Sequence, residues 1–324
     1  MTRMLMSIRG LICILALVLC SATTSQAGDY PNRPIQIVVP FGPGGTSDLS
    51  VRFLAEKWQE FLGQPVVILN KPGAGSAVGA RFVAESKPDG YTLLLGSDSP
   101  LVVVRIMNKN LGYDLDSFTY LFGYASGAVY FVDKSDSPMK SMADVIAAAK
   151  KEPGKMTYAT HGVGSLSNFI AEALWKETGV KIAHVPFKAS PEANAAVLGG
   201  HVNLAVPPSI GDLARNGNIR VLAVTSKNRV PYAPNVPTLN ELGYKTNLVY
   251  YSLLVGPKGL PDEVKAKLIT AQQKAYEKYG PEISATLNRL ELVPAQLTGE
   301  QAKNEMREHD KWFRDLAGQM GLTN

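Results

Sequence analysis

Short apolar runs alternate with amphipathic segments along most of the chain. The first amphipathic segment carries Leu49, Phe53, Trp58 and Phe61 near a helical period, and Gly63 after them predicts a left-handed stop. Thr46 or Ser47 is the predicted N-cap of this helix. Runs rich in β-branched residues predict strands at 35–39, 66–69, 91–95, 157–159, 181–185, 202–206 and 220–224. This alternation predicts an α/β fold in which helices cover parallel sheets.

Two further β-rich stretches, 118–132 and 249–255, predict strands that cross between two lobes. A capping box of Ser141 and Asp144 opens a helix near the start of a second α/β unit. Amphipathic helices predicted over 262–279 and 299–320 return the chain to the first lobe. We therefore expect lobe 1 to comprise 28–129 plus 254–324, and lobe 2 to comprise 130–253.

The amino terminus has the pattern of a secretory signal peptide. Arg3 and Arg9 precede an uncharged apolar run at 11–20, and a small-residue triplet ending at Ala27 offers a cleavage site. We expect residues 1–27 to be removed and the mature chain to be periplasmic. Lipidation at Cys20 is an alternative, but the bulky Leu19 stands where a lipobox has a small residue.

Composition narrows the possible chemistry. Both cysteines lie in the predicted signal peptide, so cleavage leaves no thiol for disulfides or catalysis. Removing Arg3 and Arg9 leaves 31 basic residues against 28 acidic ones, because no acidic residue is lost, and the net charge falls from +5 to +3. The basic residues are scattered and do not alternate with aromatic residues, which argues against nucleic-acid binding.

Two glycine turns follow predicted strands and precede predicted helices. The first contains Gly44, Gly45, Thr46, Ser47 and Asp48, and the second contains Thr160, His161, Gly162, Gly164 and Ser165. Glycines permit close backbone approach, and a helix N-terminus offers free N–H groups and a positive dipole end. Ligands of open α/β sheets bind at the carboxyl ends of strands. The turns therefore predict a two-sided anion site in one crevice.

The order of several short motifs resembles the Bug family of extracytoplasmic solute receptors, the binding components of tripartite tricarboxylate transporters. The matching segments are 39–48, 70–75, 87–94, 158–165, 185–188, 198–200, 222–226 and 234–238. The resemblance implies a type II periplasmic-binding-protein fold, with two lobes joined by two crossover strands and a small organic acid held between them. It also implies that main-chain groups of the two glycine turns, with waters, hold a carboxylate.

Several side chains near the turns are further candidates for the ligand site. His161, where the family often has a small residue, either donates to a second polar group of the ligand or is a surface residue without a role. Asp48 either meets an ammonium group or stabilises the helix start. Ser97 and Asp98 follow the third strand and are expected to border the cleft. Lys188 either pairs with a distal carboxylate or is solvated, and Phe41, Phe187 and Tyr251 either line the cavity or belong to the core.

An enzyme is the alternative from another functional class. Ser165 and His161 suggest a hydrolase constellation, but no G-x-S-x-G elbow is present in the sequence. The four histidines lack the spacing of helical zinc sites, and the glycine turns lack complete P-loop or dinucleotide signatures. We therefore expect no catalysis, metal or cofactor. The predicted function is a monomeric receptor that delivers a carboxylate to a membrane permease; an exported hydrolase and a partner of a membrane sensor remain alternatives.

Overall fold

The computed structural model describes residues 30–108, 110–211, 216–226, 228–230, 233–245 and 248–319. The predicted signal peptide and both cysteines lie outside these residues. Contacts group Arg33–Asn324 into one compact unit, whose described part contains two sheets. No helix within the described ranges combines the length and apolar character that a membrane crossing requires.

The first sheet, which with its helices we call lobe 1, has six strands in the order β11-β4-β10-β3-β1-β2. Its strands β1, β2 and β3 are parallel, whereas β10 runs antiparallel to β3 and β4, and β11 antiparallel to β4. The bounds are β1 Ile35–Val39, β2 Val66–Asn70, β3 Thr92–Gly96, β4 Phe118–Gly127, β10 Tyr250–Pro257 and β11 Val293–Thr298.

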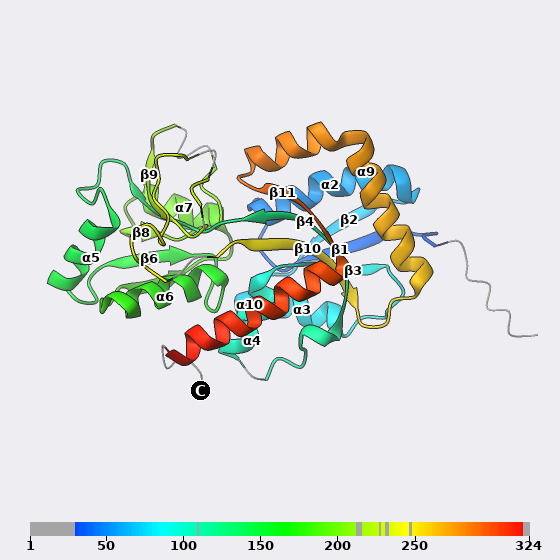
Figure 1. The fold of residues 1–324 in the computed structure, drawn as a ribbon, viewed down its shortest axis with the longest axis horizontal. Coiled ribbons are helices and arrows are strands. Elements are labelled where there is room, and N and C mark those ends of the chain that lie inside the picture. Colours follow the sequence, from blue (N-terminus) through cyan, green and yellow to red (C-terminus); the bar gives the residue numbers. More distant parts are fainter. Residues whose placement is uncertain are drawn as a thin grey trace, which may run out of the picture. The chain divides into compact units, whose positions relative to one another are not determined.

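The second sheet, which with its helices we call lobe 2, has five strands in the order β7-β6-β8-β5-β9. Here β6 pairs in parallel with β7 and β8, while β5 is antiparallel to β8 and β9. The bounds are β5 Tyr130–Lys134, β6 Thr157–Thr160, β7 Ala183–Pro186, β8 Leu204–Ala205 and β9 Ile219–Val224. The chain passes from lobe 1 to lobe 2 between β4 and β5 and returns between β9 and β10 (Figure 1).

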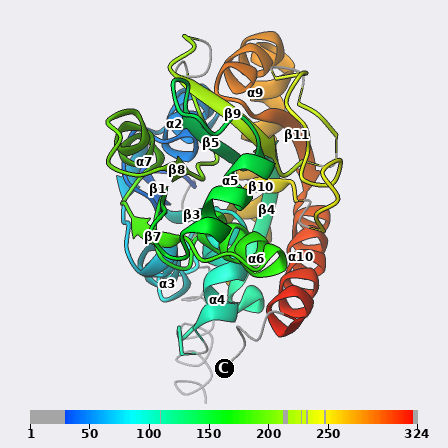
Figure 2. The same cartoon turned by 90° about the vertical axis from the view of Figure 1, so that its left-hand side faces the viewer.

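Helices flank both sheets. In lobe 1, α2 packs against α9 and α10 packs against β4. The far part of α10 lies beside α6 of lobe 2 (Figure 2). There Phe313 of α10 meets Phe169 of α6 edge to face, with 5.1 Å between ring centroids. The bounds are α2 Thr46–Leu62, α3 Ala77–Ala84, α4 Val104–Met107, α5 Met142–Lys151, α6 Leu166–Thr178, α7 Ser190–Leu198, α9 Asp262–Arg289 and α10 Gly299–Gln319.

The two-lobed α/β prediction is confirmed, but its strand directions are only partly right. Each sheet combines a parallel βαβ portion with antiparallel strands where the chain crosses between lobes. Strand β11 was not predicted, because its residues are all intermediate or exposed and form no continuous apolar run. A predicted helix at 262–279 extends in the structure to Arg289, through Pro281.

The buried face of α2 differs from the predicted one, and only Trp58 belongs to both. Leu49 is 43% exposed, and the buried stripe runs instead through Val51, Leu54, Trp58 and Leu62 at i, i+3 and i+4 spacing. Gly63 ends the helix in the left-handed conformation, as predicted. The N-cap is Gly45, not Thr46 or Ser47, and no side chain caps this end of the helix.

Candidate functional site

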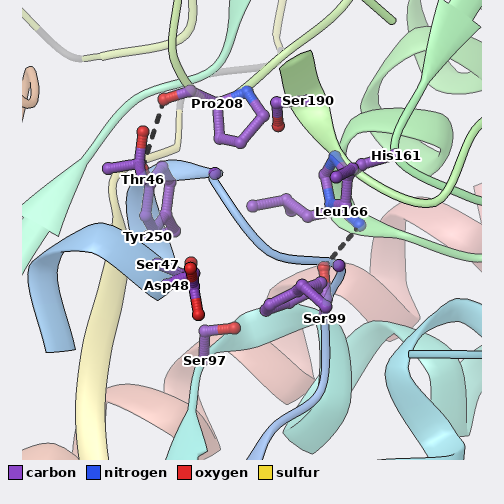
Figure 3. A pocket seen from close by; sticks show the side chains of 14 residues that line it. Thr46, Ser47, Asp48, Ser97, Ser99, His161, Leu166, Ser190, Pro208 and Tyr250 are labelled. Atoms are coloured by element: carbon purple, nitrogen blue, oxygen red, sulfur yellow. Dashed lines mark hydrogen bonds between the residues drawn. The ribbon is translucent and has the colours of Figure 1, made fainter. Parts of the chain in front are cut away.

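A partly open space between the lobes, here called the inner cavity, lies at the carboxyl ends of β1 and β3 (Figure 3). About 40 Å³ of it is open to the centre of a water molecule. The predicted site residues that line it are Phe41, Gly45, Thr46, Ser47, Asp48, Ser97 and His161. The residues that sequence analysis missed are Gly42, Ser99, Leu166, Ala189, Ser190, Pro208 and Tyr250.

The turn before α2 is held in place by the carboxylate of Asp48. This buried side chain accepts hydrogen bonds from the Gly44 N–H at 2.9 Å, from Asn70 Nδ2 at 2.9 Å and from Arg52 Nε at 3.0 Å. Burial acts to raise the pKa of Asp48, but hydrogen bonds from Arg52, Gly44 and Asn70 outweigh it, so the pKa lies below its ordinary value. Asp48 is therefore ionised, and both of its carboxylate oxygens accept hydrogen bonds from within the protein. This favours the interpretation that Asp48 stabilises the helix start and does not bind an ammonium group of a ligand.

The start of α2 leaves backbone donors available at the inner cavity. Gly44 has φ +83°, which glycine adopts without strain, and it aims the chain into the helix. No oxygen of the described residues accepts from the N–H groups of Thr46 or Ser47. These orphan donors lie at the positive end of a 17-residue helix. This half of the predicted anion cradle has the expected geometry.

The second predicted turn satisfies most of its donors within the protein. The Gly162 N–H donates to Thr160 Oγ1 at 3.2 Å, and the Gly164 N–H donates to Asn168 Oδ1 at 2.9 Å. Ser165 caps α6 by accepting from the Asn168 N–H at 3.3 Å, and the Leu166 N–H donates across the lobes to Ser99 Oγ at 2.8 Å. Thr160, Gly162, Gly164 and Ser165 do not line the inner cavity, whereas His161 does, and its backbone N–H has no acceptor among the described residues. Within this turn, donation to a ligand in the inner cavity therefore stays a prediction for His161 alone.

The N-terminus of α7 brings a second set of backbone donors to the inner cavity. Its N-cap Ala189 and first residue Ser190 are buried and line the inner cavity, and no side chain caps the helix. No acceptor among the described residues pairs with the Ser190 N–H. The sequence carried a signal for this end, because Ser190, Pro191 and Glu192 have the composition of a first helical turn. No glycine turn precedes α7, so this helix end was not among the predicted donors.

His161 lies between the inner cavity and an outer groove. Its ring meets Phe41 of lobe 1 edge to face, with 5.6 Å between centroids. The Nδ1 atom is shielded from solvent and has no hydrogen-bond partner. Burial, with a smaller effect of nearby His184, lowers the pKa of His161 to about 4, so the imidazole is neutral near neutral pH. A charged His161 contact with ligand is therefore not expected under those conditions.

The residues after β3 divide between two environments. Ser97 and Ser99 line the inner cavity, but Asp98 turns away and is fully buried, where it pairs with His309 of α10 and accepts from the Tyr251 N–H at 3.2 Å. Because successive residues of a strand face opposite sides, Tyr250 lines the inner cavity while Tyr251 stacks on His309. The placement of Asp98 at the cleft was therefore wrong by one residue, and Tyr251, for which the sequence left a cavity or a core position open, does not line the inner cavity.

Two larger grooves adjoin the inner cavity. The first outer groove, about 470 Å³, contains Gly44, Asn194 and Arg289, and it shares Gly45, Thr46 and Ser190 with the inner cavity. The second outer groove, about 450 Å³, contains Gly162, Gly164, Phe187 and Lys188, and it shares Phe41 and His161 with the inner cavity. Lys188 is exposed, so its ammonium group is outside the inner cavity.

Direct contacts between the lobes surround this site. The Gly42 N–H donates to the Lys188 carbonyl at 3.2 Å, in addition to the bond between Leu166 and Ser99. A Cβ atom added at Gly75 would lie only 2.5 Å from the carbonyl oxygen of Val163. The lobes are therefore closed on each other around the cavity.

Comparison with protein families identifies one model along most of the chain. The model described as tripartite tricarboxylate transporter family receptor matches residues 50–321. A Cupriavidus necator protein known as "UPF0065 protein in gbd 5'region" is 34% identical over 305 residues, which cover 92% of this chain and 91% of that protein. Protein BugT of Bordetella pertussis is 34% identical over 267 residues, covering 80% and 82%.

Solved structures share the fold. MatC from Rhodopseudomonas palustris with bound malate has 25% identity and a TM-score of 0.84, and the match covers 89% of this chain and 99% of that one. An R. palustris protein with adipate has 28% identity and a TM-score of 0.84, with 90% and 99% covered. The resemblance to the Bug family, and the two-lobed fold that it implies, are confirmed.

Proposed function

We propose, because the chain belongs to the tripartite tricarboxylate transporter family of receptors, that it is a periplasmic solute receptor that binds a small organic carboxylate in the inner cavity. The observation that carries the proposal is the meeting of two uncapped helix N-termini, those of α2 and α7, at one partly open space between the lobes. Backbone N–H groups at such termini bind carboxylates. The malate and adipate seen in two similar structures belong to the same chemical class.

Ligand binding and lobe closure are coupled in this proposal. The α2 terminus belongs to lobe 1 and the α7 terminus to lobe 2, so a carboxylate reaches both only when the lobes are closed. A ligand that binds one conformation more tightly shifts the population toward it. The closed form then presents a continuous surface to its membrane partner.

The cellular setting is part of the same proposal. Residues 1–27 act as a cleaved signal peptide, the receptor works as a monomer, and permease subunits of a tripartite transporter accept its cargo. In this proposal the two bodies that move follow the predicted division into 28–129 plus 254–324 and 130–253, except that all of β10, Tyr250–Pro257, moves with the lobe 1 sheet. Interaction with a membrane sensor in place of a permease is the alternative use of the closed form, and a pull-down with each partner separates the two.

Binding without turnover completes the proposal. The Ser165 hydroxyl donates to the Gly162 carbonyl at 2.7 Å, and its hydrogen bonds do not include one to His161. The hydrolase alternative needs that Ser–His hydrogen bond.

Native mass spectrometry and isothermal titration of the purified protein test the proposal. Co-purification or one-to-one binding of a carboxylate, with no change in the carboxylate after incubation, is the expected result. A folded protein that binds no member of a panel of mono-, di- and tricarboxylates would contradict it. Product formation that is lost in Ser165→Ala would favour the hydrolase.

A further inference from the structure

The inner cavity is lined by few charged groups. Among its lining residues only Asp48 carries a full charge, and the guanidinium of Arg52 neutralises it from the far side of the turn. No lysine or arginine is among these residues. Arg289 and Lys188 line the outer grooves and not the inner cavity. Positive potential in the inner cavity therefore comes from backbone donors.

Those backbone donors supply about one positive charge. Each helix N-terminus is equivalent to roughly half an elementary charge, so α2 and α7 together offer about +1. One carboxylate matches this value. A second carboxylate in the same space would be desolvated without a counter-charge, which is costly in a protein interior.

The size of the inner cavity sets a second limit. A water molecule needs about 10–15 Å³ of the volume open to its centre, so 40 Å³ holds about three waters. Because the inner cavity is partly open and shares lining residues with both outer grooves, this volume limits the part of a ligand that it holds and not the length of the whole ligand. Its non-carboxylate end meets Leu166, Pro208 and Phe41, with the Ser97 and Ser99 hydroxyls and the neutral His161 as polar neighbours.

We infer that the receptor selects a monocarboxylate whose second polar group, where it lies in the inner cavity, is uncharged, such as a 2-hydroxy or 2-oxo acid. This inference rests on the proposed function, because it specifies the ligand of the same site. It distinguishes this chain from similar proteins whose structures hold malate or adipate, both of which are dicarboxylic acids. His161 becomes a specificity-determining residue, because it places a neutral ring at the inner cavity, where a cation would donate hydrogen bonds to a second carboxylate.

Isothermal titration with a matched pair of ligands tests the charge. Malonate and its monoamide have the same shape and differ by one charge, and the monoamide is expected to bind about tenfold more tightly or better. Equal affinity, or tighter binding of malonate, would overturn the inference.

A charge-inserting variant provides the converse test. His161→Lys adds a cation beside the inner cavity and is expected to move the malonate-to-monoamide affinity ratio about tenfold toward malonate. Gln273→Lys is the control, because it adds the same charge at an exposed position of α9 that lines neither the inner cavity nor the outer grooves. An unchanged ratio in His161→Lys would contradict the assigned role of His161.

The same titrations separate this inference from the proposed function. If dicarboxylates bind more tightly than monocarboxylates, the receptor function stands and the ligand class is wrong. If the folded protein binds no carboxylate of either kind, both are wrong.

Discussion

Asp98, at the end of β3, forms a buried ion pair with His309 of α10, and through its other oxygen it accepts from the Tyr251 N–H on β10. The pair thus ties the strand that carries Ser97 and Ser99 to the crossing strand and to the C-terminal helix. Loss of one partner would leave a charge buried without its counter-ion. We predict that Asp98→Ala lowers the free energy of unfolding by about 3 kcal/mol in urea titrations.

The same pair predicts a pH dependence of stability. Burial acts to lower the pKa of His309, but attraction and hydrogen bonding to Asp98, with contributions from Glu305 and Glu308, raise it above the ordinary value of 6.5. A raised folded-state pKa stabilises the protein fully below the unfolded-state pKa, and the effect is lost as pH rises through the folded-state pKa. The stability difference between wild type and His309→Gln is therefore expected to be larger at about pH 6 than at about pH 9. A difference that grows with pH would contradict this assignment.

Asp48 predicts the opposite pH dependence. Its pKa lies below the ordinary value of 3.8, so its contribution to stability is present above that value and lost as pH falls through the folded-state pKa. Because Arg52 is 43% exposed, we discount the ion pair and expect Asp48→Asn to cost only about 1 kcal/mol at neutral pH. Urea titrations from pH 7 down to about pH 3 should show the two proteins converging at the acid end. Constant separation across this range would exclude Asp48 as an ionised anchor.

Closure of the lobes predicts the effect of a substitution at Gly75. Gly75→Ala introduces a Cβ only 2.5 Å from the Val163 carbonyl, so closure requires the loops to move apart. We expect about tenfold weaker carboxylate binding and a larger radius of gyration in the presence of ligand, measured by small-angle X-ray scattering. Gly63→Ala is the matched control, because Gly63 has a similar φ of +68° but nothing within 4 Å of the added atom. Similar affinity loss in both variants would attribute the effect to backbone strain alone.

The α7 terminus can be tested by giving it a carboxylate of its own. Asp is a good N-cap, so Ala189→Asp is expected to occupy the α7 donors, abolish ligand binding and leave the melting temperature unchanged or raised. Ala189→Asn caps the helix without a charge and has nearly the same size. It is expected to retain more affinity in calorimetry than Ala189→Asp. Undiminished binding by Ala189→Asp would exclude α7 from the site.

The fold followed from the sequence where local chemistry and burial agree. The parallel strands β1, β2 and β3 have apolar runs, and Gly63 and Ser141 occupy the helix ends predicted for them. The failures arose where tertiary contacts decide. Leu49 has the spacing of a core residue but lies on the exposed face of α2. Strand β11 forms because it pairs with the outer edge of β4, and its own sequence does not indicate that pairing.

The candidate site was predicted in part for the same reason. The turn before α2 has donors free, as its glycines indicated. The turn at 160–165 looks similar in sequence, yet Asn168 accepts from its Gly164 N–H, and Ser165 and the distant Ser99 take the N–H groups of Asn168 and Leu166 in the helix that follows. Ser99 lies 67 residues away from Leu166, and no local pattern reveals such a bond. Helix ends are therefore identified as anion sites only after their tertiary partners are known.

A crystal structure of the protein with a bound monocarboxylate such as lactate would test the central claim most directly. The predicted result is a carboxylate whose oxygens lie within about 3.2 Å of backbone N–H groups at Thr46 or Ser47 and at Ser190, directly or through one water. A carboxylate bound instead by the Gly162–Ser165 turn, or one located only in the outer grooves, would contradict the account.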